Sequence, residues 1–232
     1  MSGIDRRAFV KKAGIGAAGA GALWVAPSVL GLDAAFAGAS CLQQDTLNWN
    51  NFTAGTTPPA TLQTFPAVGS YPAVTLSYTL TTVGAPGAGT NNNTVQPGPQ
   101  GNINSNYYRI SMTASAAGQG RTLTYTWSRN IYNLRFTIVD IDRISGTQNW
   151  QDIVWLSSTP TIISQGSRVD GLGTAGTPWS GNGNGNVGST SNLGNVSLSI
   201  AGPITTLTIN YRSGNPFGTE QFVGIENLTW CR

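Results

Sequence analysis

Apolar and polar residues alternate along much of the chain after residue 40. The clearest case is the segment 73–82, where every second residue is apolar: Val74, Leu76, Tyr78 and Leu80. Serine or threonine fills the positions between them, and the segments 121–127 and 205–211 repeat this pattern. A period of two places successive side chains on opposite faces of a strand. These segments therefore predict strands with one buried face and one face in water.

The same signal covers ten segments: 46–53, 73–82, 107–115, 121–127, 132–141, 152–157, 161–164, 196–201, 205–211 and 221–230. No segment after residue 40 has the period of an amphipathic helix, and strong helix formers are scarce there. Ten short strands that each have one polar face predict an all-β fold. We expect an antiparallel β-sandwich of jelly-roll type.

Four stretches that lack the alternation are expected to be loops: 54–59, 83–106, 145–149 and 170–195. The second and fourth exceed about 20 residues, which is longer than ordinary connections and predicts either mobile or functional segments. No linker separates two comparable halves of the chain. Residues 38–232 are therefore expected to form a single domain.

The N-terminus begins with a short charged segment. Asp5 precedes the pair Arg6 and Arg7, and Phe9 follows this pair after one intervening residue. A mildly apolar stretch rich in glycine and alanine then covers 13–32. This order resembles the twin-arginine export signal of bacteria and archaea. The resemblance implies the twin-arginine translocase as a partner and a destination outside the cytoplasm, secreted or at the cell surface.

A cleavage motif follows the apolar stretch. Ala35 and Ala37 place small side chains at the −3 and −1 positions that signal peptidase recognises. We therefore expect cleavage after residue 37 and no membrane attachment afterwards. The alternative is an uncleaved membrane anchor over 13–32, whose length suits a span. Several glycines and Pro27 interrupt that stretch, which favours cleavage.

Removing residues 1–37 changes the charge of the protein. The full chain has 12 basic and 9 acidic residues and a formal net charge of +3. Eight arginines and seven carboxylates remain after residue 37, which leaves a net charge of +1. The basic pI of 9.1 therefore reflects the signal. A basic surface for nucleic acid is not expected.

Histidine is absent from the whole chain, and lysine is absent after residue 37. The chain thus lacks the commonest general base, the commonest zinc ligand and every serine–histidine pair. Only 9% of residues are charged, against about 25% in an ordinary domain. We therefore expect a non-catalytic protein whose surface is wetted by hydroxyls and amides, with no required cofactor.

Cys41 and Cys231 are the only two cysteines. An oxidising destination favours a disulfide between them, which would contribute about 4–5 kcal/mol on the chain-entropy model of a long loop. The alternative is lipidation of Cys41. The three residues before Cys41 are Gly38, Ala39 and Ser40, without the large apolar residue that a lipidation motif requires, so the disulfide is preferred.

Three carboxylates form the most pointed group of candidate ligands. Asp140 and Asp142 lie at the end of the strand at 132–141 and continue its inward parity, and Asp152 opens the next strand. A hairpin between the two strands would bring the three side chains to one rim of the sandwich. Calcium prefers such oxygen ligands, so a structural Ca²⁺ site is one prediction. The alternative is a turn in which water solvates the three carboxylates or nearby arginines at 129, 135 and 143 neutralise them.

This region also carries a family resemblance. The sequence Asp-Ile-Asp at 140–142 and Asp-Ile-Val at 152–154 resembles a pattern in secreted bacterial jelly-roll-like surface domains. The segment 222–229 is similar to the closing strand of the same domains. The resemblance covers about a third of the chain after residue 37. It implies a β-sandwich on the cell exterior and carries over no catalytic residue.

Tryptophans near loops suggest a second kind of site. Trp49, Trp150 and Trp179 lie next to polar neighbours and are candidates for stacking on sugar rings. The alternative is that they belong to the core or anchor long loops. A glycoside hydrolase would need two carboxylates, for which Asp140 with Asp152, or Glu220 with Glu226, are the conceivable pairs.

The sequence thus leaves two main functional classes. The first is an exterior structural protein whose copies associate through strand edges that lack protective charges. The second is a glycan-binding or adhesion module that uses aromatic residues of the loops. A glycoside hydrolase is the third and weakest class.

Overall fold

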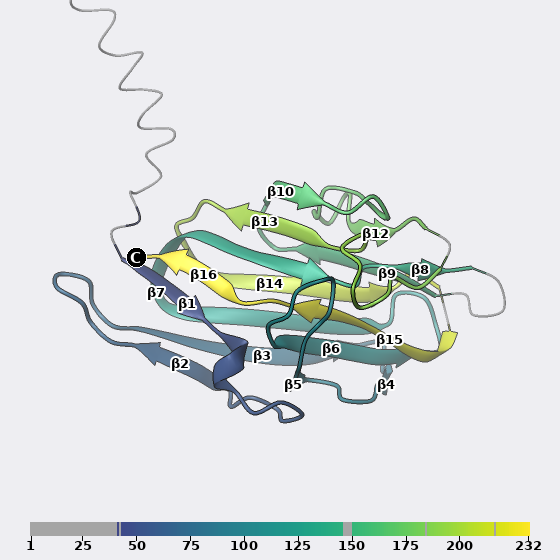
Figure 1. The fold of residues 1–232 in the computed structure, drawn as a ribbon, viewed down its shortest axis with the longest axis horizontal. Helices are drawn as coiled ribbons and strands as arrows, with labels where there is room; N and C mark the ends of the chain where they lie inside the picture. Colours follow the sequence, from purple (N-terminus) through teal and green to yellow (C-terminus); the bar gives the residue numbers. More distant parts are fainter. Residues whose placement is uncertain (1–40, 42, 146–149, 184, 216) are drawn as a thin grey trace, which may run out of the picture. The chain divides into compact units, whose positions relative to one another are not determined.

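The computed structural model describes residues 41, 43–145, 150–183, 185–215 and 217–232. Residues 41–232 form one compact unit, shown as the coloured ribbon in Figure 1. The predicted export signal at Arg6, Arg7 and Phe9 lies outside the described residues. The same holds for the predicted cleavage site at Ala35 and Ala37.

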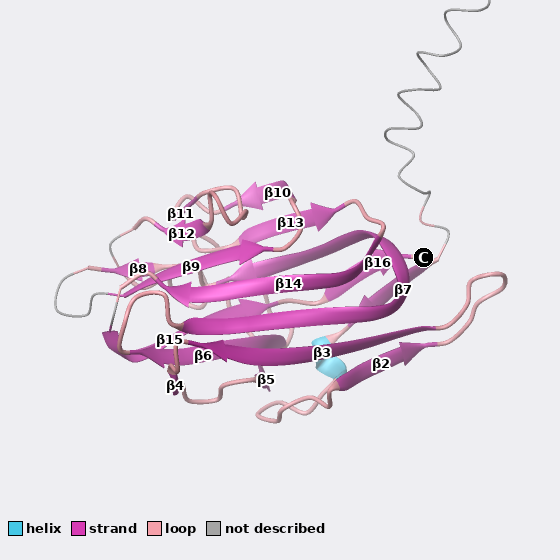
Figure 2. Cartoon of the chain, turned by 180° about the vertical axis from the view of Figure 1, so that it is seen from behind, coloured by secondary structure: helices cyan, strands magenta, loops and turns pink. Residues whose placement is uncertain are grey.

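Two antiparallel sheets build this unit (Figure 2). Sheet I runs in the order β2 (Thr61–Phe65), β3 (Val74–Val83), the first half of β7 (Gly120–Val139), β14 (Ile204–Ser213), β9 (Trp150–Leu156), β12 (Trp179–Gly181) and β11 (Val169–Asp170). A short strand, β8 (Arg143–Ile144), pairs with β9. The predicted all-β antiparallel sandwich is confirmed.

Sheet II contains the second half of β7. On one side β7 pairs with β13 (Val196–Ile200), which in turn pairs with β10 (Thr161–Gln165). On the other side it pairs with β16 (Leu228–Cys231) and β15 (Phe217–Ile225). The sheet then continues through β1 (Gln44–Leu47), β6 (Tyr107–Ala114), β4 (Gly87–Ala88) and β5 (Thr94–Gln96).

The long strand β7 links the two sheets. Residues 120–127 pair with β3 and β14, whereas residues 132–139 pair with β13, β15 and β16. Ser128, Arg129 and Asn130 are exposed at the bend between the halves. The sequence predicted two separate strands here because three consecutive polar residues are typical of a turn. The structure joins them into one bent strand.

Alternating apolar residues fill the space between the sheets. Leu123, Tyr125 and Trp127 of β7 are almost fully buried. Trp127 packs edge-on against Trp230, which packs in the same way against Phe65. Burial of each large apolar side chain stabilises the fold by about 1.5–3 kcal/mol. The predicted period of two therefore marks the core correctly.

Other boundaries differ from the predicted ones. The strand predicted at 46–53 ends at Leu47, because Asn48 caps the short 3-10 helix η1 (Trp49–Asn51) and accepts a hydrogen bond from the Asn50 amide. The strand predicted at 221–230 is divided at residues 226–227 into β15 and β16. Strands β4, β5 and β12 form within predicted loops, and β11 begins one residue before the predicted loop 170–195; each is only two or three residues long.

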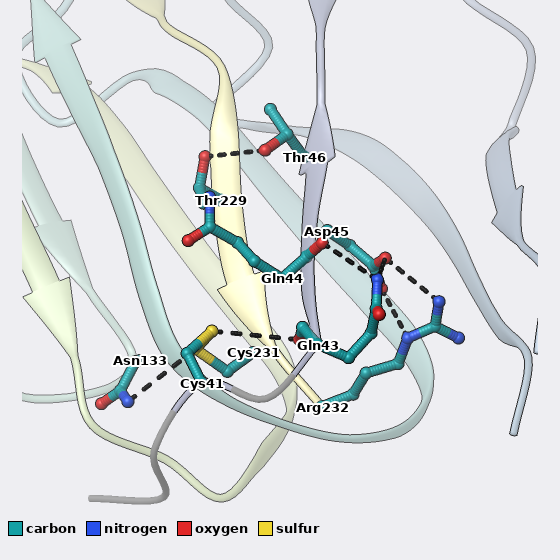
Figure 3. The surroundings of a disulfide bond; sticks show 9 residues. All are labelled: Cys41, Gln43, Gln44, Asp45, Thr46, Asn133, Thr229, Cys231 and Arg232. Atoms are coloured by element: carbon teal, nitrogen blue, oxygen red, sulfur yellow. Dashed lines mark hydrogen bonds and ion pairs between the residues drawn. A yellow bond between two sulfur atoms is a disulfide. The ribbon is translucent and has the colours of Figure 1, made fainter. Parts of the chain in front are cut away.

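The predicted disulfide between Cys41 and Cys231 is confirmed, with the two Cα atoms 5.1 Å apart. It lies at the end of the β1–β16 pair, as Figure 3 shows. Beside it, Arg232 forms an ion pair with Asp45 at 2.9 Å, and both side chains are almost fully buried. The bridge and the ion pair together fasten both ends of the described unit to each other. Among the described residues, no helix is long and apolar enough to cross a membrane.

Candidate functional site

The three predicted aspartates meet where β7 ends and β9 begins. Asp140 and Asp142 directly follow β7, Asp152 lies within β9, and all three are buried. Two hydrogen bonds join Asp142 and Asp152, each donated by a backbone amide. The Asp142 amide donates to Asp152 Oδ2 at 3.1 Å, and the Asp152 amide donates to the Asp142 carbonyl at 2.9 Å. The hairpin of β8 and β9 therefore brings Asp142 and Asp152 together.

Protein donors occupy the carboxylate oxygens of Asp142 and Asp152. Trp150 Nε1 donates to Asp142 Oδ1 at 3.0 Å, and the Val187 amide donates to Asp142 Oδ2 at 2.8 Å. The Tyr211 hydroxyl donates to Asp152 Oδ1 at 2.7 Å. With the Asp142 amide on Asp152 Oδ2, all four oxygens accept a hydrogen bond. These contacts connect β7, β9, β14 and the loop after β12.

Burial dominates the electrostatics of this group. It raises the pKa of Asp152 well above its usual value, and the neighbouring Asp142 adds to the rise. The pKa of Asp140 is raised in the same way, by burial and then by Asp142, while Arg109 and Gln100 oppose the rise. Low-dielectric surroundings also raise the pKa of Tyr211, which therefore stays a hydrogen-bond donor.

This arrangement gives no support to the calcium prediction. Within the described part of the chain, no group of three or more histidine, cysteine, aspartate or glutamate residues is placed to hold a metal ion. The alternative was that arginines 129, 135 and 143 neutralise these aspartates, but none of the three forms an ion pair with them in the described structure. The ion pairs of the described residues are Arg109–Glu220 and Arg232–Asp45. Asp142 and Asp152 instead form a buried, hydrogen-bonded junction between elements, whereas Asp140 Oδ1 is buried without a hydrogen-bond partner among the described residues.

The tryptophans predicted to stack on sugars are largely buried. Trp49 is 1% exposed, stacks on Tyr108 and donates its Nε1 hydrogen to the Glu226 carbonyl. Trp179 is fully buried beneath Gly173, where an added Cβ would approach the indole ring to 2.4 Å. Both predictions of an exposed platform are therefore wrong, because these rings complete the core. Trp150 is half-buried and bound to Asp142.

A groove of mixed polar and apolar lining crosses the outer face of sheet II. It consists of three adjoining hollows with volumes of about 480, 360 and 420 Å³. The first two hollows share Ile103 and Ser197, and the second and third share Arg135 and Thr229. We call this feature the outer groove. Its third hollow lies beside the disulfide drawn in Figure 3.

The outward positions of the strands supply the floor of the outer groove. On β7, Asn133, Arg135 and Thr137 alternate with inward residues, so their side chains face away from the core. Ser197 of β13 lies opposite Thr137, and their hydroxyls form a hydrogen bond of 2.9 Å. The loop that contains residues 101–105 forms a wall, since Ile103 contributes to the first two hollows.

Glu226 is the carboxyl side chain that lines the outer groove. It is 5% exposed, and its Oε2 accepts a hydrogen bond of 2.8 Å from the Ser105 hydroxyl. Its other oxygen, Oε1, has no partner among the residues that the structure describes. Burial raises the pKa of Glu226 to about 7, while the Ser105 hydrogen bond opposes the rise.

Asn195 forms a second incompletely bonded group in the groove. Its Nδ2 donates to the Gly101 carbonyl at 2.8 Å, which fixes the orientation of the amide. Its Oδ1 is buried and lacks a partner within the described ranges. Buried polar atoms without a partner are few in native proteins and call for an explanation such as water or a ligand.

Of the four carboxyl groups considered for hydrolysis, Glu226 alone belongs to the described lining of the outer groove. Glu220 is engaged by Arg109 at 2.9 Å, and Asp152 is held by Tyr211. In the described lining of the groove, Glu226 is the only carboxyl side chain, whereas glycoside hydrolysis uses two. The sequence placed Glu226 inside a strand and missed the groove. The sequence did contain one indication of the groove, namely the polar residues at every second position of β7 and β13.

Comparison of the chain with models of protein families, with curated proteins and with solved structures gives no match.

Proposed function

We propose that the chain is exported by the twin-arginine route and acts outside the cytoplasm as a non-catalytic structural protein. In this proposal its copies associate through the open edges of their sheets. The resemblance of the segment around Arg6 and Arg7 to a twin-arginine signal supports this destination. The Cys41–Cys231 disulfide is consistent with an oxidising environment.

The edge strand β10 carries the proposal of self-association. It pairs with β13 alone in the described part of the sheet, so its other edge offers free backbone groups. Its residues are Thr161, Ile162, Ile163, Ser164 and Gln165, without charge or proline. Natural proteins protect such edges with lysine, proline, a covering element or a β-bulge. Of these, β10 has an irregularity in register between Ile162 and Ser164, but it carries no charge and no proline. Ile163 is 57% exposed, which adds an apolar contact for an incoming strand.

Strand β2 offers a second edge of the same kind. It pairs with β3 alone among the described strands, and its residues Thr61–Phe65 carry no charge. It belongs to sheet I, whereas β10 belongs to sheet II. Pairing of β10 in one copy with β2 in the next would be a head-to-tail contact, which generates rings or open filaments.

A charge placed on β10 tests the proposal. We expect the purified protein to form oligomers or filaments in size-exclusion chromatography with light scattering and in electron microscopy. Ile163→Lys should return it to a monomer, because each added strand would then bury a charge. Leu172→Lys is the matched control, since Leu172 is 58% exposed but lies in a loop. A protein that stays monomeric, or an I163K variant that assembles like the parent, would refute edge association.

A further inference from the structure

The outer groove presents hydrogen-bonding side chains together with small apolar patches. Hydroxyls and amides come from many lining residues, among them Asn102, Ser105, Asn192, Ser197, Asn227 and Thr229. The apolar patches come from Ile103, Ile163 and Leu193, of which the last two are at least 37% exposed. Sugar rings also combine hydroxyl edges with apolar C–H faces, so this lining has the chemistry that a sugar requires.

The charge of the groove favours a neutral ligand. Its described lining holds one guanidinium group, that of Arg135, and one carboxyl group, that of Glu226. An anionic chain would meet the Glu226 carboxylate, and a cationic chain would meet Arg135. Neither sign of charge is clustered along the three hollows, so the groove lacks the row of like charges that would attract a polyelectrolyte.

The length of the groove favours a chain over a single sugar. The three hollows are joined through shared residues, at Ile103 and Ser197 between the first and second and at Arg135 and Thr229 between the second and third. A ligand of several linked units would fill them in succession. We therefore propose that the outer groove binds a neutral polysaccharide chain across the outer face of sheet II.

Two buried acceptors define where such a chain would be held. Glu226 Oε1 and Asn195 Oδ1 line different hollows, and each lacks a hydrogen-bond partner within the described structure. The hydrogen bond to the Gly101 carbonyl holds the Asn195 amide in place, whereas the terminal torsion of the Glu226 carboxyl group is broad, so a rotation of Glu226 would turn Oε1 toward the groove. A sugar hydroxyl then supplies the missing donor. Completing a buried hydrogen bond removes the desolvation cost of an orphaned acceptor.

An extended peptide fits the groove less well. Peptides that bind sheets add a strand to an open edge and pair through backbone groups. The floor of the groove is formed by β7, β13 and β16, whose backbones already pair with neighbouring strands. Its side chains, not its backbone, supply the hydrogen bonds. This observation favours a polyhydroxylated ligand.

Affinity electrophoresis in native gels tests the proposal with named probes. We expect at least one of laminarin, xylan, mannan and dextran to slow the purified protein, whereas anionic alginate should not slow it. Ser197→Tyr places a ring at the junction of the first two hollows and should weaken the affinity about tenfold or more. Thr229→Tyr blocks the other junction and serves as a second variant if S197Y does not fold.

The matched control is Ser77→Tyr. Ser77 is also half-buried and outward-facing, but it lies on β3 of sheet I, away from the groove residues. S77Y should bind the glycan as the parent does, which excludes a general effect of an added aromatic ring. The proposal is overturned if none of the four glycans slows the protein. It is also overturned if S197Y and T229Y both bind like the parent, or if a gel containing gelatin slows the protein and the glycan gels do not.

Discussion

The Tyr211 hydroxyl donates a hydrogen bond of 2.7 Å to Asp152 Oδ1, and both side chains are almost completely buried. Tyr211 belongs to β14 and Asp152 to β9, which are neighbouring strands of sheet I. The other carboxylate oxygen of Asp152 accepts from the Asp142 amide, at the end of β7. One buried carboxyl group therefore holds three strands in register.

Tyr211→Phe should lower the free energy of unfolding by about 1–3 kcal/mol, because it leaves a buried carboxyl oxygen without a donor. Urea denaturation followed by tryptophan fluorescence measures this change. Tyr125→Phe is the control. Tyr125 is equally buried in β7, and its hydroxyl has no hydrogen-bond partner among the described residues. Its removal should change stability by less than about 1 kcal/mol. Equal losses for the two variants would contradict the role of the Tyr211–Asp152 bond.

Opening the disulfide should destabilise the protein strongly. Cys41 and Cys231 are separated by 190 residues, so the bridge restricts nearly the whole unfolded chain. The chain-entropy model assigns about 5 kcal/mol to a loop of this length. We expect a double Cys41→Ser and Cys231→Ser variant to unfold at a much lower guanidinium concentration than the parent. A reducing agent should shift the parent midpoint toward that of the variant and leave the variant unchanged; coincident midpoints under oxidising conditions would argue against the model.

Much of this core was predictable because one physical rule governs it. Leu123, Tyr125 and Trp127 alternate with threonines, and a sandwich buries one face of each strand. The disulfide was predictable for a similar reason, since two cysteines in an oxidising compartment have one pairing. Neither inference requires knowledge of which strands are neighbours.

The rest depends on contacts between distant segments. Trp179 lies in a stretch rich in glycine and asparagine, so nothing in its surroundings predicts that β12 pairs with β9 and buries the ring. Gly181 of β12 also lies close to the backbone of Asp142, and only a glycine fits there because a Cβ would lie 2.2 Å from the Asp142 carbonyl carbon. The outer groove likewise forms only when the loop with Ile103 lies beside β13. Local periodicity carries no information on either contact.

Calcium is expected to leave the melting temperature unchanged. Each oxygen of Asp142 and Asp152 already accepts a hydrogen bond from a protein donor, and a cation would have to displace those donors. Thermal scans of protein freed from metal with a chelator, with and without millimolar calcium, measure the effect. A saturable rise with calcium but not magnesium, lost on Asp140→Asn, would restore a calcium site at this junction.

Acid should stabilise the fold through Glu226. Its pKa is about 7 in the folded protein and 4.5 in the unfolded reference, so between these values the native state binds more protons than the unfolded state. Stability therefore falls as pH rises from 4.5 to 7 and levels off above that window. A shift of this size corresponds to about 3 kcal/mol. Glu226→Gln removes the titration while keeping the shape of the side chain.

The test compares urea unfolding of the parent and of E226Q across pH 4.5–8. The variant should gain about 3 kcal/mol relative to the parent over this range, because the parent alone must bury an ionising carboxyl. The raised pKa values of Asp140 and Asp152 act in the same direction, but they are common to both proteins and cancel in the difference. A difference in stability that stays constant with pH would show that Glu226 ionises at its ordinary value, accommodated by water or by movement of the loop that carries Ser105.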